Sequence, residues 1–266
     1  MAAMHVIEID DPADPRLDDF RELADADVRP DRRGVVIAEG VNVVERLARS
    51  PYPMRAVIGV ASRLESLSEP LAGVDVPGYC VDKWVLSDVV GFRVTRGVIA
   101  SALRPAPPDI AALLRTARRI AVLEALNDFE NLGALFRNAA AFGVDAVLLD
   151  PRCADPLYRR SVRVSMGHVL RVPFAELPGE WPQSLATVRG AGFDLLALTP
   201  VASAELLSRV VPPPRWAVLL GAEGPGLSEA AMAQVARRVR IPMADGVDSL
   251  NVATAAAVAF AHLTSA

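Results

Sequence analysis

Hydrophobic and polar residues alternate most regularly in the C-terminal half of the chain. Apolar runs of four to seven residues recur there between amphipathic segments, a pattern that indicates parallel strands covered by helices on both faces. The predicted strands are 120–125, 144–150, 169–174, 193–199, 216–221 and 239–242. The predicted helices are 131–142, 156–164, 181–191, 228–235 and 249–262. Ligands bind beyond the carboxyl ends of such strands. A site is therefore expected in the loops after Ala125, Thr199, Gly221 and Pro242.

The N-terminal half has a mixed pattern, which indicates an α/β or α+β unit. Its predicted strands are 35–38, 56–60 and 77–81, and its predicted helices are 16–24 and 42–49. Between the halves, Pro105, Pro107 and Pro108 exclude a continuous helix or central strand. We therefore predict a first domain over 1–104, a proline-rich linker and lead-in over 105–117, and a second domain over 118–266.

Composition identifies a globular protein without a generally basic surface. Hydrophobic residues make up 52% of the 266 residues and charged residues 23%, which is typical of a folded chain. The formal net charge of -4 counts against a simple nucleic-acid binder, although it leaves room for a local basic patch. Lys83 is the only lysine. The chain therefore uses arginine for nearly all of its positive charge. Arginine binds phosphate with a planar, forked guanidinium group, but a GC-rich genome explains the preference for arginine over lysine equally well.

The sequence gives no sign of export, membrane insertion or metal binding. The acidic N-terminus lacks the apolar segment of a secretory signal. The longest apolar stretch, near 253–261, is too short to span a bilayer. Cys80 and Cys153 lie far apart and have no His or Cys at ligand spacing, so free thiols are expected. We predict a cytoplasmic protein with no metal and no membrane partner.

The first notable loop runs from Asn127 into a helix whose apolar stripe is Leu132, Leu135, Phe136 and Ala139. Asp128 or Asn131 can cap this helix. Arg137 lies about 140° around the helix from Leu132 and so off the stripe. Taken alone, this loop is explained better by an exposed arginine on a capped helix than by a functional site.

The second loop, 219–228, combines three glycines with Glu223 between an apolar strand and a helix. Glycine lets the backbone approach a ligand closely, but neither the GxGxxG nor the GxxxxGK pattern is present. In the third loop, 241–252, Asp248 or Ser249 can cap the following helix. Asn251 would then lie two positions inside that helix, where asparagine is a mediocre helix former.

Together, the three loops resemble the motifs of the SpoU (TrmH) branch of the SPOUT methyltransferases over residues 118–263. The matching motifs are Asn131-x-Gly133-x-x-x-Arg137, Gly221-x-Glu223-Gly224-x-Gly226-Leu227, and Ile241-Pro242-Met243 with Ser249-Leu250-Asn251-Val252. In the N-terminal half, Ile37-Ala38-Glu39-Gly40 resembles the ribosomal-protein-like RNA substrate-binding domain often found ahead of this catalytic domain.

The resemblance implies an α/β fold with a deep C-terminal trefoil knot, S-adenosylmethionine as cofactor, and a homodimer that shares its active sites. The reaction implied is methyl transfer to a ribose 2′-hydroxyl in rRNA or tRNA. The positions that match the catalytic centre are Asn131, Arg137, Glu223, Ser249 and Asn251. Those that match cofactor contacts are Thr199, Gly221, Ile241, Met243 and Leu250. The implied reaction needs no metal.

The sequence departs from the family pattern at two places. Phe129 and Glu130 stand where Pro or Gly often precedes the first asparagine, and His168 stands where a small residue is common. We expect His168 to be structural. Arg137 is expected to act as an electrostatic clamp rather than as a general base, because arginine is very hard to deprotonate.

Two other classes of protein compete with this hypothesis. One is a non-catalytic RNA-binding or ribosome-assembly protein that kept the fold. Intact polar positions at Arg137, Glu223 and Asn251 count against it. The other is a Rossmann-type nucleotide-binding enzyme, which the missing phosphate loop disfavours. Binding of the methyl donor would separate these classes.

Overall fold

The computed structural model describes residues 4–23 and 34–265, and these form two compact units. Unit 1 contains the described residues of 1–106 together with 157–171, and unit 2 contains 107–156 and the described residues from 172 onward. The main boundary falls within the proline-rich segment. The assignment of 157–171 to unit 1 differs from the continuous second domain predicted over 118–266.

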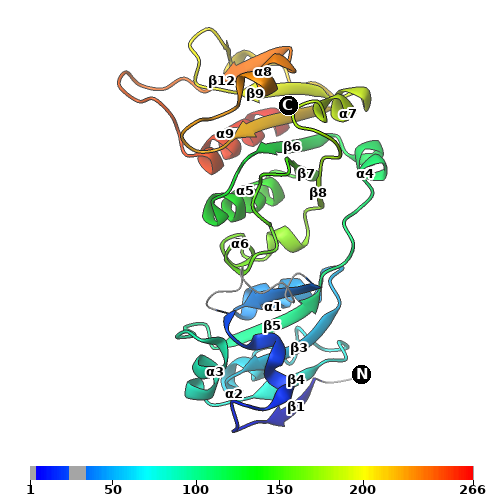
Figure 1. Cartoon of the computed structure of the whole chain (residues 1–266), viewed down its shortest axis with the longest axis vertical. Coiled ribbons are helices and arrows are strands. Elements are labelled where there is room, and N and C mark those ends of the chain that lie inside the picture. The colour runs from blue at the N-terminus through cyan, green and yellow to red at the C-terminus, as the bar shows by residue number, and fades with distance from the viewer. Residues whose placement is uncertain (1–3, 24–33, 266) are drawn as a thin grey trace. The chain divides into compact units, whose positions relative to one another are not determined.

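Unit 1 is built on a five-stranded mixed sheet in the order β1-β4-β3-β5-β2 (Figure 1). Strand β4 pairs in parallel with β1 and β3, whereas β5 pairs antiparallel with β2 and β3. The strands are β1 (His5–Glu8), β2 (Val35–Glu39), β3 (Met54–Gly59), β4 (Pro77–Cys80) and β5 (Val98–Leu103). The helices are η1 (Pro15–Phe20), α1 (Val41–Ala48), α2 (Ala61–Glu65), α3 (Lys83–Val90), α6 (Arg159–Val164) and η4 (His168–Leu170).

The sequence pattern located four of these elements to within two residues, namely β2, α1, β3 and β4. The helix predicted over 16–24 is a 3-10 helix over Pro15–Phe20, and residue 24 lies outside the described residues. The sequence pattern missed β1, α2, α3 and β5. The first two are a four-residue strand and a five-residue helix, which are too short to show a clear hydrophobic period.

Segment 157–171 joins unit 1 through an ion pair and a buried apolar run. Arg159 lies 2.9 Å from the Glu39 carboxylate, which is almost fully buried, and its guanidinium lies 4.3 Å from the centre of the Phe92 ring. The strand predicted over 169–174 is wrong. Gly167, with φ of 81°, leads into the 3-10 helix η4, which buries Val169 and Leu170 without sheet pairing.

Unit 2 is built on a seven-stranded sheet in the order β10-β12-β9-β11-β6-β7-β8, with every pair parallel. The predicted parallel sheet is thus confirmed. The strands are β6 (Arg119–Glu124), β7 (Ala146–Leu149), β8 (Phe174–Glu176), β9 (Asp194–Leu198), β10 (Glu205–Leu206), β11 (Trp216–Gly221) and β12 (Arg237–Arg240). The helices are α4 (Ile110–Thr116), α5 (Phe129–Ala141), α7 (Leu185–Gly190), η5 (Leu207–Arg209), α8 (Glu229–Ala233) and α9 (Val252–Thr264).

The strand order of unit 2 determines where a site can form. Strands β12, β9, β11 and β6 are consecutive neighbours and parallel, so their carboxyl ends lie along one edge of the sheet. The core beneath them is aliphatic, with Ile120, Val122, Leu148 and Leu219 fully buried. Helices α5 and α9 pack against each other. The loops predicted to carry the site therefore emerge side by side.

The described residues can be examined for metal sites, disulfides and membrane-spanning helices. Residues 4–23 and 34–265 contain no group of three or more His, Cys, Asp or Glu residues arranged to hold a metal ion. Cys80 and Cys153 are both free thiols. Burial raises the pKa of Cys153 to about 12, so this thiol stays protonated at neutral pH. No helix in residues 4–23 or 34–265 is long and apolar enough to cross a membrane.

Candidate active site

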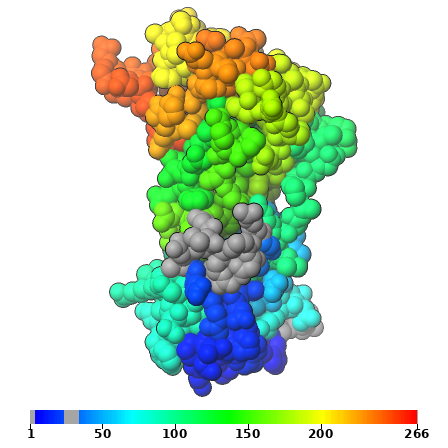
Figure 2. Space-filling model, viewed as in Figure 1, coloured from blue at the N-terminus to red at the C-terminus, as the bar shows by residue number. Residues whose placement is uncertain are grey.

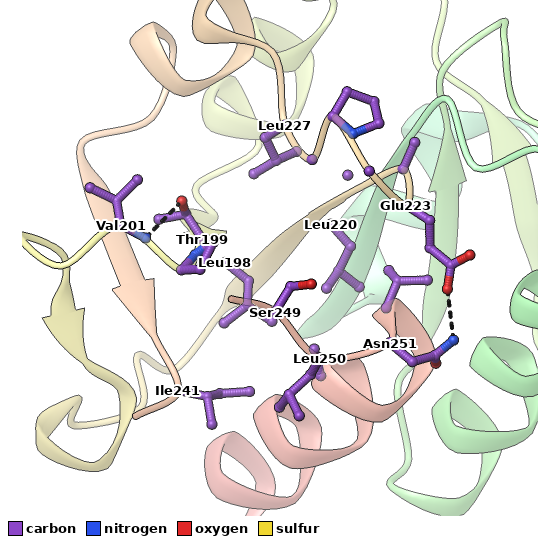
Figure 3. Close-up of a pocket in the computed structure, with 18 of the residues that line it drawn as sticks. Leu198, Thr199, Val201, Leu220, Glu223, Leu227, Ile241, Ser249, Leu250 and Asn251 are labelled. Atoms are coloured by element: carbon purple, nitrogen blue, oxygen red, sulfur yellow. Dashed lines mark hydrogen bonds between the residues drawn. The ribbon is translucent and has the colours of Figure 1, made fainter. Parts of the chain in front are cut away.

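A cavity of ≈ 560 Å³ lies beyond the carboxyl ends of β9, β11 and β12 (Figure 3). Residues 198–201, 220–227 and 249–252 line it together with Ile241 and Met243, which follow β12. Three of the four loops predicted from the sequence, those after Thr199, Gly221 and Pro242, thus converge on one cavity, whereas the loop after Ala125 does not line it. All five residues predicted for cofactor binding line it, namely Thr199, Gly221, Ile241, Met243 and Leu250.

Gly221 ends β11 where the chain folds back on itself. A Cβ atom there would lie 2.2 Å from the Gly226 carbonyl carbon and 2.3 Å from the Leu227 nitrogen. The turn is closed by a hydrogen bond of 3.0 Å from the Gly226 N–H to the Ala222 carbonyl. Gly224 and Gly226 have φ of 83° and 69°, which L-residues with a side chain rarely adopt. Backbone geometry therefore accounts for the three glycines of this loop.

The chemistry of the lining favours a ligand that is largely apolar and carries positive charge. Figure 3 shows the side chains of Leu198, Leu220, Leu227, Ile241 and Leu250 around the cavity. Thr199 and Ser249 supply hydroxyl groups. Among the described residues that line the cavity, the only charged side chain is Glu223. A cofactor rich in phosphate would find no cationic side chain there.

Asn251 links two of the loops to a helix that lies outside the cavity lining. Its Oδ1 accepts hydrogen bonds from the Ala253 and Thr254 N–H groups at 3.0 and 3.2 Å. Its Nδ2 donates to Asn131 Oδ1 at 2.6 Å and to Glu223 Oε1 at 2.9 Å. One amide thus caps α9 and connects the glycine-rich loop to α5.

This arrangement corrects the prediction for the third loop. Helix α9 begins at Val252 rather than Ser249, and its N-cap is Asn251 rather than Asp248 or Ser249. Asparagine is therefore in a favoured position for its type. On α5, the cap is Asp128, whose carboxylate accepts from the Asn131 N–H at 2.7 Å. One of the two predicted caps for that helix is thus confirmed.

The five residues predicted for catalysis fall into two groups. Glu223, Ser249 and Asn251 line the cavity. Asn131 and Arg137 lie on α5, and Asn131 reaches the first group through its bond to Asn251. Arg137 does not line the cavity. Its side chain is exposed and makes no hydrogen bond or ion pair with a described residue, so its guanidinium is available to a ligand.

A buried carboxylate missed by the sequence interpretation supports the same edge of the sheet. Glu124, the last residue of β6, is 2% exposed. It accepts from Trp181 Nε1 at 2.7 Å, from Arg152 Nη2 at 3.0 Å and from the Ser228 N–H at 2.9 Å. Ser228 follows the glycine-rich loop and caps α8. Glu124 thus fixes the end of that loop. The signal that could have identified it is an acidic residue at the end of an apolar strand.

Asp150 continues this network behind the first loop. Its buried carboxylate accepts from the Ala125 N–H at 3.1 Å, where the backbone has φ of 52°. It also pairs with Arg152 at 2.6 Å. Asp150, and after it Glu124, raises the pKa of Arg152. The start of the loop that leads to Asp128 and α5 is therefore held by buried charge.

Comparison with known proteins gives a consistent result. Residues 118–261 match the model of the SpoU rRNA methylase family. An uncharacterized tRNA/rRNA methyltransferase of Mycobacterium bovis is 50% identical over 98% of this chain and 92% of its own. A 23S rRNA guanosine 2′-O-methyltransferase of Bacillus subtilis is 23% identical over 96% and 98% of the two chains.

The crystal structure of an AdoMet-bound rRNA methyltransferase from Sinorhizobium meliloti has the same fold. Its TM-score is 0.79 at 23% identity, and the match covers 97% of both chains. The parallel sheet and the convergent loops define an α/β protein with a cavity at the strand ends. The chain belongs to the SpoU rRNA methylase family. It is an RNA methyltransferase of that family, whose methyl donor is S-adenosylmethionine.

Proposed function

We propose that this enzyme transfers a methyl group from S-adenosylmethionine to a ribose 2′-hydroxyl in rRNA or tRNA. The observation that carries the proposal is the Asn251 side chain. It joins the cavity to α5, the helix that carries Arg137. The Bacillus subtilis relative, which modifies a guanosine 2′-oxygen in 23S rRNA, supports the same acceptor.

The residues that line the cavity fit S-adenosylmethionine. A volume of ≈ 560 Å³ lies within the range of about 300–1,000 Å³ typical of small-molecule sites. Leucine and isoleucine side chains suit the adenine ring, and the exposed backbone of the glycine-rich loop suits its polar edge. The cofactor supplies an electrophilic methyl group on a positively charged sulfur. Thr199, Gly221, Ile241, Met243 and Leu250 would hold it, and the Glu223 carboxylate complements its charge.

The protein's own groups would align the acceptor and stabilise charge. Arg137 would bind the phosphate next to the target ribose and stabilise the developing alkoxide, as cationic groups do in other transferases. The Asn131 Nδ2 amide makes no hydrogen bond to a described residue, so it is free to orient the ribose. Ser249 would hold the substrate. Glu223 would orient the substrate through its second carboxylate oxygen, since Asn251 donates to Oε1. Alignment alone supplies up to about 7–11 kcal/mol in favourable cases.

Asn251→Asp is expected to reduce methyl transfer by at least about tenfold while leaving α9 capped, since Asp caps as well as Asn. The variant loses both Nδ2 bonds and turns a carboxylate toward Glu223. Initial rates with radiolabelled methyl donor measure the effect. The matched control is Asn138→Asp, which replaces another amide donor between α5 and α9, bound to the Ala253 carbonyl at 2.8 Å. A wild-type rate in Asn251→Asp would remove this residue from the proposed centre.

We also propose that the enzyme is a homodimer. Residues 244–251 are all exposed, and Figure 2 shows this loop, in orange-red, projecting from the body of unit 2. It presents Val247 and Leu250 to solvent, at 48% and 38% exposure. A second copy covering these apolar side chains would complete the site beside the cavity. Analytical ultracentrifugation is expected to find a dimer, and a fully active monomer would contradict the proposal.

Three further predictions belong to this proposal, the first two from the resemblance and the third from the sequence itself. They are RNA binding by unit 1, a trefoil knot in unit 2, and a cytoplasmic location. The knot is supported by the strand order, since β9, β11 and β12 lie on the far side of β6 from β7 and β8. A crystal structure whose backbone trace forms no knot when its two ends are extended would exclude this feature.

Mapping ribose methylation in cells tests the proposed reaction. Alkaline hydrolysis of rRNA and tRNA leaves a resistant bond at each 2′-O-methylated nucleotide. One resistant position is expected to disappear when the gene is deleted and to return with the wild-type gene, but not with an Arg137→Ala gene. Identical maps in the two strains, or a lost base methylation instead, would overturn ribose as the acceptor.

A further inference from the structure

Unit 1 contains a second cavity, of ≈ 360 Å³, whose lining is mainly polar. It is formed by residues 39–43, by Arg63, by Thr95 and Arg96, and by Arg163 and Met166 of the segment that joins unit 1 from the second half of the sequence. Three arginines in one cavity stand out in a chain with a net charge of -4. None of the three guanidinium groups forms an ion pair or hydrogen bond with a described residue.

The backbone of this cavity adds further hydrogen-bond donors. Helix α1 begins at Val41, and its N-cap is Gly40, which has no side chain to cap the helix. The Val43 and Val44 N–H groups are bonded to the Gly40 carbonyl. The N–H groups of Val41 and Asn42 remain at the cavity wall, where helix N-termini attract anions.

Gly40 also lies in contact with an arginine. It has φ of 95°, and a Cβ atom there would lie 3.5 Å from the Arg96 side chain. The aliphatic part of Arg96 thus packs over the helix start. On the opposite side, Arg46 donates to the Met166 carbonyl. The segment that contributes Arg163 is therefore fixed to α1.

Among the described residues of the lining, one carries a carboxylate, and it is already neutralised. Glu39 is 3% exposed and pairs with Arg159 at 2.9 Å. The remaining charged groups of the lining are Arg63, Arg96 and Arg163. The Asn42 amide and the Thr95 hydroxyl add neutral polar groups. A lining rich in donors, with forked guanidinium groups, matches a phosphate group.

We propose that this cavity binds a phosphodiester of the substrate RNA. The inference rests on the proposed function for the identity of the RNA as substrate. Phosphate contacts position a nucleic acid without reading its sequence. The cavity would therefore hold the RNA in register while unit 2 carries out methyl transfer. This role accounts for three arginines whose guanidinium groups find no partner within residues 4–23 and 34–265 of a protein that is acidic overall.

The double variant Arg63→Ala/Arg96→Ala tests the proposal. Its KM for rRNA from the deletion strain is expected to rise about tenfold, with kcat and S-adenosylmethionine affinity unchanged. Its affinity for a fluorescein-labelled RNA hairpin should also depend less on salt, with the slope of log K against log salt smaller by about one. Arg49→Ala is the control. It removes an exposed arginine from the other end of α1, where Arg49 pairs with Glu45 at 2.8 Å.

Asn42→Asp separates binding from folding. Asp in the first turn of a helix stabilises it through the helix dipole, so the melting temperature should stay the same or rise. The same carboxylate would repel phosphate, so the KM for rRNA should rise. The change in net charge equals that of Arg49→Ala, which should leave KM unchanged. A structural role for this position would instead lower the melting temperature as the KM rises.

The outcomes separate this inference from the proposed function. A wild-type enzyme that methylates no RNA ends the proposed function, while hairpin binding still tests the cavity. Wild-type methylation with unchanged KM and salt slope in both cavity variants overturns the cavity's role. Calorimetric titration with inorganic phosphate tests whether the cavity binds a free anion. Saturable binding of phosphate at micromolar concentrations, with normal RNA binding by the variants, would assign the cavity to a free anion instead of RNA.

Discussion

Replacing Arg137 with alanine is expected to reduce methyl transfer by about 10²–10³-fold, the usual cost of removing one group that stabilises charge in a transition state. Affinity for S-adenosylmethionine should stay nearly unchanged, because Arg137 does not line the cavity. Fold stability should also hold, since the side chain is exposed and makes no hydrogen bond or ion pair within the described chain. Single-turnover rates at saturating RNA and cofactor measure the chemical step separately from binding.

Arg115→Ala is the matched control for this experiment. Arg115 is an exposed arginine in the last turn of α4, in the same unit, and it does not line the cavity. Its removal changes net charge equally and should leave the rate unaltered. Wild-type turnover in Arg137→Ala would show that the guanidinium plays no part in the chemistry. Loss of cofactor binding in that variant would place Arg137 in the cofactor site instead.

Gly221→Ala is expected to lower the affinity for S-adenosylmethionine by about 10²-fold or more, because small displacements of a site have effects of that size. The new methyl group would lie 2.2–2.4 Å from backbone atoms of Gly226 and Leu227. These are main-chain atoms, so the clash can be relieved only by moving the glycine-rich loop. Overpacking of this kind also lowers stability, typically by about 1–3 kcal/mol.

Gly190→Ala provides the comparison. Gly190 ends α7, and no atom lies within 4 Å of where its Cβ would be. This variant should bind the cofactor normally and gain up to about 1 kcal/mol of stability, since glycine destabilises a helix. Thermal melts of both variants show whether any loss of binding reflects unfolding. Normal cofactor affinity in a folded Gly221→Ala protein would mean that the loop over Gly221 does not form the cofactor site.

The sequence predicted the elements whose hydrophobic period is long and regular. Strand β11 lies at Trp216–Gly221, as its six-residue apolar run indicated, and α5 lies within two residues of its predicted bounds. The place of the cavity was also predictable, because a parallel sheet brings the ends of neighbouring strands together. Asparagine at 251 looked out of place inside a helix, and the structure shows that it is the N-cap of that helix instead. Glycine is required at 221 because a side chain there would meet the backbone of Gly226 and Leu227.

Other features depend on contacts between residues distant in the sequence. Asn251 could not be identified as a cap, because Asp248 and Ser249 are equally good caps in the same loop. The role of Glu124 arises from Trp181 and Ser228, which lie 57 and 104 residues away. Segment 157–171 belongs to unit 1 because of its pairing with Glu39 and its packing on α1, 120 residues earlier. No local pattern encodes such pairings.

Calorimetric titration of the purified protein with S-adenosylmethionine, ATP and NAD tests the central claim most directly. The claim is that the loops after β9, β11 and β12 form a methyl-donor site. The expected result is saturable binding of S-adenosylmethionine at micromolar concentrations and no heat from the two phosphate-bearing nucleotides, because Glu223 is the only charged residue in the described cavity lining. Binding of ATP or NAD in its place would contradict the claim. Absence of methyl-donor binding would point instead to a non-catalytic RNA-binding protein.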